Sequence, residues 1–226
     1  MMTLIEHPAR FEGIYEASEA SRFIATTLRT DTPLNITSRK VIYWIRRGLT
    51  ARDLTIIPGR ELLLAFEDVI SMRVIAALRA AGVKFSRIYE AEKWLREVTG
   101  HPRPFATEML WTEKSDIFVD MKRKLIAASR SGQYAFQILE EYLIPVHGIR
   151  FNEQHVAQNW EPRTNILLDP LIQFGAPCIK GTRIPTRALW GMVMGGDTIE
   201  YVAQSYHLTV EHVQNAIDWE DALIKN

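Results

Sequence analysis

The chain has 226 residues, in which 27 Lys and Arg balance 27 Asp and Glu, and 47% of the residues are hydrophobic. This composition excludes intrinsic disorder and fibrous repeats, and the length allows one large domain or two small ones at roughly 100–200 residues each. The chain contains neither the ~18 consecutive apolar residues of a membrane span nor the basic and apolar start of a signal peptide. We therefore expect a cytoplasmic protein with no membrane partner.

The neutral total conceals two regions of opposite charge. Residues 1–103 contain 16 Lys and Arg against 12 Asp and Glu, a net charge of +4, so the remaining residues carry −4. Residues 39–60 hold six basic side chains and a single acidic one, whereas residues 197–221 hold six acidic side chains and neither Lys nor Arg. Because phosphate is attracted to positive charge, these counts predict nucleic-acid contact near the first stretch and not near the second.

Apolar residues recur at three- and four-residue spacing in four segments of the first hundred residues, which predicts helices there. The predicted helices cover residues 15–28, 37–48, 67–80 and 86–99. Thr37 or Ser38 is placed to cap the second helix, and Gly48 supplies the left-handed residue that follows a helix end. The second helix is strongly basic and follows the first after a turn, so the pair predicts a helix-turn-helix.

Two β-prone runs lie between the second and third of these helices. They cover residues 54–57 and 61–65 and are joined at Pro58-Gly59, which predicts a hairpin tipped by Arg60. A hairpin that follows a helix-turn-helix is a wing. The prolines of residues 101–104 disfavour helix in the residues before them and mark the expected end of the first domain.

The next segment, up to residue 164, is ambiguous because short apolar runs fit strands and helices alike. The expected elements are a hairpin at Glu113-Lys114, a strand or short helix over 124–129, a helix over 133–143, and strands over 148–152 and 156–160. Together they predict a small connecting sheet with one helix.

Sharper signals return after residue 164. Lys180-Gly181-Thr182 predicts a tight hairpin turn, and three helices are expected over residues 186–194, 198–206 and 210–224. Asp197 is the expected cap of the second of these helices and Thr209 that of the third. The last two form a second helix-turn-helix shape. The predicted fold class is therefore mainly α with small β elements (α+β).

The residues that catalysis or metal binding would need are not found at the required spacings. The six His residues show no ligand pattern, and neither a nucleotide-binding glycine motif nor a nucleophile elbow occurs. Cys178 fits a small buried hydrophobe, and the adjacent acids Glu140-Glu141 and Glu220-Asp221 are interpreted as solvated surface. We expect no catalytic residue, no metal, no cofactor and no enzymatic activity.

Residues 14–100 resemble the DNA-binding domain of MerR-type regulators. The resemblance rests on Tyr15, Glu19 and Ala20, on the basic segment TSRKVIYWIRRGL, and on EDVISMRVIAALRAAGVKFSRI after the wing. It implies a winged helix-turn-helix domain over residues 10–103. The turn DTPLN is longer than is usual in that family, and no long coiled-coil helix follows.

Residues 165–219 closely resemble the domain of unknown function 433. The matching positions are Pro170, Gly175, Pro177, Ile179, Gly181, Thr182, Arg183, Ile184, Pro185, Gly196 and Asp197. The two-domain arrangement resembles VapB-type antitoxins, which implies a protein that binds its own promoter and neutralises a PIN-like ribonuclease toxin. The implied organisation is a connecting sheet and helix over residues 104–164 and a helical module over residues 165–226.

The residues expected to bind double-stranded operator DNA follow from helix insertion into the major groove. Side chains near the start of the basic helix would reach base edges, and later ones and the wing would contact phosphates. The base-edge candidates are Thr37, Ser38, Arg39, Lys40 and Tyr43, and the phosphate candidates are Arg46, Arg47 and Arg60. A homodimer is expected because operators are usually palindromic.

The expected toxin contacts are cations, because PIN-like nucleases hold Mg²⁺ with a cluster of carboxylates. The candidates are Arg163, Lys180, Arg183 and Arg187, together with Trp190 on a helix that is apolar on nearly every side. Arg183 also fits a structural role in which it bonds backbone carbonyls and pins the hairpin to the helices.

Two other functions stay open on the sequence. One is a ligand-responsive MerR-like transcriptional regulator without a toxin partner, in which residues 105–164 would form the sensor. The other is a structural adaptor that uses both helix-turn-helix shapes for protein contact and binds no DNA.

Overall fold

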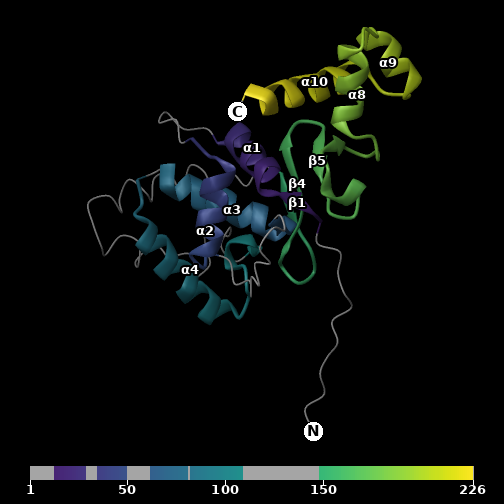
Figure 1. Ribbon diagram of the computed structural model, residues 1–226. Helices are drawn as coiled ribbons and strands as arrows, with labels where there is room; N and C mark the ends of the chain where they lie inside the picture. The colour runs from purple at the N-terminus through teal and green to yellow at the C-terminus, as the bar shows by residue number, and fades with distance from the viewer. Residues whose placement is uncertain (1–12, 29–34, 50–61, 81, 109–147, 226) are drawn as a thin grey trace.

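The computed structural model describes residues 13–28, 35–49, 62–80, 82–108 and 148–225. These residues form seven α-helices and two small antiparallel sheets, a mainly helical α+β fold that confirms the predicted fold class (Figure 1). None of the described helices combines the length and the apolar composition that crossing a bilayer requires.

Four helices make up the front half of the chain, each within a few residues of its predicted position. They are α1 (Ala17–Thr27), α2 (Ser38–Arg46), α3 (Phe66–Ala80) and α4 (Phe85–Thr99). Thr37 is the cap of α2, since its side-chain oxygen accepts a hydrogen bond from the Lys40 amide at 3.4 Å. Gly48 follows the helix with φ +83°, as the sequence predicts.

A short ladder connects the end of the predicted wing to the start of α1. Strand β1 (Tyr15–Glu16) pairs antiparallel with β2 (Leu63–Leu64). The tip of the predicted hairpin, with Arg60, lies outside the described residues. After α4 the chain forms a short 3₁₀ helix, Pro104–Ala106. The elements predicted between residues 109 and 147 also lie outside the described part.

The second sheet has four antiparallel strands in the order β3-β4-β5-β6. They are β3 (Ile149–Phe151), β4 (Ala157–Arg163), β5 (Ile166–Leu168) and β6 (Cys178–Ile179). The first two confirm the pair of short strands expected before residue 164. Because β5 and β6 continue the same sheet, the connecting segment and the C-terminal module share it. The predicted tight turn follows β6, with φ +80° at Gly181.

Three helices close the chain: α8 (Thr186–Met194), α9 (Ile199–Ser205) and α10 (Val210–Lys225). The Thr209 hydroxyl accepts from the His212 amide at 3.1 Å, which confirms the predicted cap of α10. The predicted Asp197 cap is wrong. Thr198 takes that position, and its hydroxyl accepts from the Tyr201 amide at 3.2 Å.

The front half and the C-terminal elements meet in one continuous core. Figure 1 shows α1 between the helices of the front half and the end of α10. The buried rings of Phe23 in α1 and Trp219 in α10 lie 5.9 Å apart between centroids. Nearby, Gly175 has φ +93°, and a Cβ added there would lie 2.1 Å from the buried Tyr15 hydroxyl oxygen. We call this contact, defined by Phe23, Trp219, Tyr15 and Gly175, the joint.

Burial agrees with one single-residue prediction and overturns another. Cys178 is buried, as expected. Glu220, interpreted from sequence as solvated surface, is only 5% exposed. That prediction is wrong because Glu220 lies on the side of α10 that packs against α8, where the Thr186 hydroxyl replaces water as its partner.

Candidate functional site

Exposed basic side chains gather on one side of α2. Arg39, Tyr43, Arg46 and Arg47 are exposed, and their three- and four-residue spacing places them on one helix face. Arg47 Nε donates to the Tyr43 hydroxyl oxygen at 3.1 Å, and its guanidinium lies 5.5 Å from the centre of the Tyr43 ring. The opposite face is buried in the core through Val41, Trp44 and Ile45. We call Arg39, Tyr43, Arg46 and Arg47 the basic face.

The other predicted DNA contacts at the start of α2 are partly occupied within the protein. Thr37 and Ser38 are half-buried, and the Thr37 side chain already accepts the capping hydrogen bond. Lys40 Nζ donates to the Asn35 carbonyl at 2.5 Å. Arg39 is therefore the more available cation at this end of the helix.

Two of the predicted partner-binding cations are tied to the fold. Arg163, at the end of β4, donates to the Asp218 carbonyl at 3.2 Å, and its guanidinium lies 5.6 Å from the centre of the Trp219 ring. Lys180 Nζ lies 2.6 Å from the Glu161 carboxylate. These contacts connect the turn and β4 to their surroundings within the same chain.

The remaining partner candidates differ in availability. Arg183 is exposed, and within the described part of the chain its guanidinium makes no hydrogen bond or ion pair. Its backbone carbonyl instead accepts from Gln173 Nε2 at 3.0 Å. Trp190 Nε1 donates to Asp221 at 2.9 Å, which links α8 to α10. Arg187 is exposed on α8. No hydrogen bond between described residues joins these five candidates into one cluster.

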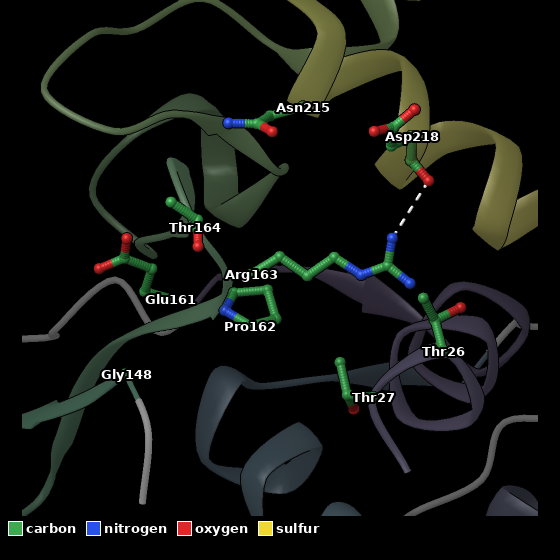
Figure 2. Close-up of a pocket in the computed structure, with 9 residues that line it drawn as sticks. All are labelled: Thr26, Thr27, Gly148, Glu161, Pro162, Arg163, Thr164, Asn215 and Asp218. Atoms are coloured by element: carbon green, nitrogen blue, oxygen red, sulfur yellow. Dashed lines mark hydrogen bonds between the residues drawn. The ribbon is translucent and has the colours of Figure 1, made fainter. Parts of the chain in front are cut away.

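A polar groove of about 720 Å³ lies where α1, β4 and α10 meet (Figure 2). In Figure 2 the Arg163 side chain extends beneath α10, and its guanidinium ends between Asp218 and Thr26. Pockets for small organic ligands are predominantly apolar, and this lining does not match them. The full lining is Thr26, Thr27, Gly148, Glu161, Pro162, Arg163, Thr164, Asn215 and Asp218.

Two carboxyl groups with raised pKa values line one small cavity beside Phe23 of the joint. Glu220 accepts a hydrogen bond from the Thr186 hydroxyl at 2.5 Å. Burial raises the pKa of Glu220, while the Thr186 hydrogen bond and the Arg187 charge oppose that shift in part. Burial also raises the pKa of Glu19 in α1, which lines the same cavity of about 100 Å³. The joint thus favours neutral carboxyl groups.

Sequence reasoning missed the residues that hold these surfaces in place. Glu92 is fully buried and pairs with Arg96 one helical turn later, and the four-residue spacing was the only signal for this pair. Tyr15 and Gly175 each stand in a motif that the sequence analysis singled out. Their mutual contact, however, carries no sequence signal because the two motifs are far apart in the chain.

Metal and thiol chemistry find little support in this arrangement. Across the residues that the structure describes, no three His, Cys, Asp or Glu side chains come together as metal ligands. Burial raises the pKa of Cys178 to about 11, so the thiolate that nucleophilic chemistry requires is scarce at neutral pH.

The C-terminal module matches a described family. Residues 166–219 match the family model whose description is "Protein of unknown function (DUF433)". The matched segment begins with β5 and ends within α10, so it includes the tight turn, Arg183 and two of the buried groups of the joint, Gly175 and Trp219.

A longer similarity links most of the chain to one named protein. The chain is 28% identical over 177 residues to "Putative antitoxin VapB45" of Mycobacterium tuberculosis (strain ATCC 25618 / H37Rv), across 71% of this chain and 72% of that protein. The crystal structure of Rv2018 from Mycobacterium tuberculosis has the same fold. Its TM-score is 0.70 at 21% identity, and the match covers 90% of this chain and 96% of that one. The chain is thus antitoxin-like in sequence over most of its length.

Proposed function

We propose that this chain is the antitoxin of a type II toxin-antitoxin pair, which neutralises a PIN-like ribonuclease toxin and represses its own operator as a DNA-binding homodimer. The observation that carries the proposal is the similarity to VapB45, which covers 71% of this chain and 72% of that protein. In this proposal the protein acts by binding and needs no cofactor.

The basic face supports the DNA-binding part of the proposal. A recognition helix enters the major groove with its N-terminal residues at base edges, so Arg39 is the leading candidate for base contact. Arg46 and Arg47 follow on the same face, where they would neutralise phosphates. The acidic stretch of residues 197–221 would repel phosphate, which leaves α2 as the favoured DNA surface.

A salt series tests this assignment. We expect the Arg39→Ala, Lys40→Ala double variant to bind the DNA directly upstream of its gene at least ~10-fold more weakly, because it loses contacts at the start of α2. The matched control is Arg150→Ala, Lys225→Ala, which removes two exposed cations outside α2. Wild-type affinity in the Arg39, Lys40 variant would refute DNA binding through α2.

Arg183 is the favoured toxin contact among the five candidates. It is exposed and without a partner in the described part of the chain, whereas Arg163, Lys180 and Trp190 already bond neighbours. An available guanidinium suits the carboxylate cluster of a PIN-like nuclease, because it bonds carboxylates in a bidentate way.

The toxin contact is tested by titrating the ribonuclease activity of the proposed PIN-like partner. We expect Arg183→Ala to weaken neutralisation by roughly 30-fold, the effect of losing one interface hot spot. Lys225→Ala serves as the control for loss of a distant exposed cation. The variant must keep wild-type circular dichroism, and equal neutralisation by a folded Arg183→Ala protein would refute this role.

A further inference from the structure

The C-terminal end of α2 is held by side chains of α4. The Phe85 ring lies 5.9 Å from the Tyr43 ring between centroids. The Tyr89 ring would lie 3.3 Å from a Cβ added at Gly48. Arg96 Nη2 donates to the Gly48 carbonyl oxygen at 3.2 Å. These contacts lie at the last turns of α2 and just beyond it, so they fix the helix from the end opposite to Arg39.

Arg96 is in turn held by a buried carboxylate. Glu92 is 0% exposed, and one of its carboxylate oxygens accepts from the same Nη2 of Arg96. Its other oxygen is buried and has no hydrogen-bond partner among the described residues. Burial raises the pKa of Glu92, and the hydrogen bond and charge of Arg96 oppose that shift. A buried carboxylate with one oxygen that makes no hydrogen bond lowers the stability of the fold. We therefore expect Glu92 to make another contribution through Arg96.

Arg96 lies where it can stabilise the C-terminal end of α2. The last carbonyls of a helix have no partner within the helix, and the helix dipole makes this end partially negative. Gly48 turns the chain out of α2 with φ +83° and directs its carbonyl to Arg96. The guanidinium, oriented by Glu92, therefore fixes the exit of α2 both by charge and by a directed hydrogen bond.

We propose that Glu92 and Arg96 are positioning residues that set the orientation of α2 for sequence-specific DNA recognition, and that they act through the Gly48 carbonyl. This inference rests on the proposed DNA-binding function. Base-edge hydrogen bonds require placement to within roughly 0.5 Å, whereas long side chains on phosphates tolerate small shifts of the helix. A displaced α2 should therefore lose sequence preference while it keeps its general attraction for DNA.

The experiment compares Glu92→Gln and Arg96→Gln with Arg87→Gln in the full-length chain. Arg87 is an exposed cation on the same helix that pairs with Glu90, so it controls for loss of a charge on α4. Affinity is measured across a salt series for the DNA directly upstream of the gene and for a scrambled duplex of equal length and composition. We expect Glu92→Gln and Arg96→Gln to lose about tenfold in affinity for the upstream DNA, and to keep the salt slope and the affinity for the scrambled duplex.

The outcomes distinguish a positioning role of Glu92 and Arg96 from a general effect on DNA affinity. A parallel loss on both duplexes, or an unchanged ratio of the two affinities, would overturn the inference. A wild-type protein that shows no preference for the upstream DNA would overturn operator binding itself, and the positioning role with it. Arg96→Lys keeps a cation near the Gly48 carbonyl, and we expect it to restore part of the preference. If the Gln variants fail to fold, an Arg96→Lys protein with the full wild-type preference would refute the inference.

Discussion

Helices α2 and α10 are each the second helix of a pair that the sequence predicts to be a helix-turn-helix, and the surroundings of the two helices differ. Both are capped by a Thr, and both bury a Trp, Trp44 in α2 and Trp219 in α10. In α2 the opposite face exposes three Arg, whereas α10 packs against α8, α9 and α1 and carries acidic residues on its exposed side. The two helices thus differ in what they leave exposed: α2 carries the basic face, whereas α10 carries acidic residues.

Packing at the joint occupies the buried side of α10. Its Trp219 contacts Phe23, and its Glu220 bonds Thr186, so two adjacent positions of the helix are committed to the core. Among the exposed residues of α10 are the acidic Glu211 and Asp218. Under the proposed function, this charge and packing favour α2 over α10 as the DNA contact.

The largest expected effect comes from breaking the joint at Gly175. A Cβ there would lie 2.1 Å from the Tyr15 hydroxyl, and the backbone φ of +93° is unfavourable for any residue with a side chain. We expect Gly175→Ala to lower the free energy of unfolding by about 3–5 kcal/mol, as overpacking and backbone strain add. Urea denaturation measures the loss.

Gly181 provides the matched control for that variant. Its φ is +80°, and nothing lies within 4 Å of an added Cβ. Gly181→Ala should therefore cost only the backbone strain, about 1–2 kcal/mol. Equal losses at Gly175 and Gly181 would show that the approach of Tyr15 to Gly175 adds nothing to stability.

The next effect compares the charges of α2 and α10 directly. We expect Arg46→Glu, Arg47→Glu to reduce affinity for upstream DNA on the order of 100-fold and to lower the salt slope by about 1.8, since each lost phosphate contact removes ~0.9. Glu211→Lys adds a cation to the exposed side of α10 and should leave affinity within about twofold. A large gain in affinity from Glu211→Lys would contradict the proposal that α2, and not α10, contacts DNA.

A smaller effect tests the raised pKa of Glu220. Burial raises the folded-state pKa of Glu220 above its unfolded value, so the folded protein holds this proton more tightly. Its contribution to stability is fully present below the unfolded pKa and is lost as the pH rises through the folded pKa. Glu220→Gln mimics the neutral form, and we expect it to stabilise the protein at neutral pH by on the order of 1 kcal/mol.

Thermal unfolding followed across mildly acidic to neutral pH checks the Glu220 prediction. The variant should show a flatter dependence of stability on pH than the wild type. Glu19 and Glu92, whose pKa values burial also raises, would contribute to the slope that remains. Asp218→Asn, at an exposed site on the same helix, controls for the loss of a carboxylate from α10. An unchanged profile in Glu220→Gln would mean that folding does not raise the pKa of Glu220.

Glu220 also shows where prediction from sequence ends. Periodicity and capping residues located all seven described helices, because these signals are local. An adjacent acidic pair at the end of a helix carries no local sign that one member is buried. The partner of Glu220 is Thr186, at the start of a different helix, so only the packing of α8 on α10 reveals it.

In the candidate site, too, contacts within one helix were predictable from the sequence, and contacts between elements were not. The basic face was predictable because Arg39, Tyr43, Arg46 and Arg47 lie on one helix, and spacing alone sets their direction. The Arg96 contact with the Gly48 carbonyl was not, because it joins two helices. The predicted partner cations come from a strand, a turn and a helix, and no sequence pattern separates those that bond neighbours in the fold from those that are available.

The smallest expected effect comes from Lys180, a predicted partner contact that already forms an ion pair within this chain. Lys180 and Glu161 form an ion pair at 2.6 Å, with 42% and 23% of their side chains exposed. Such pairs contribute little, so we expect Lys180→Met to lower the free energy of unfolding by less than about 1 kcal/mol. Because Lys180 is already paired, the variant should neutralise the toxin as well as wild type, unlike Arg183→Ala. A loss of neutralisation that matched Arg183→Ala would mean that the toxin displaces Glu161 and takes Lys180 as well, and that availability in the free chain does not identify the contact residue.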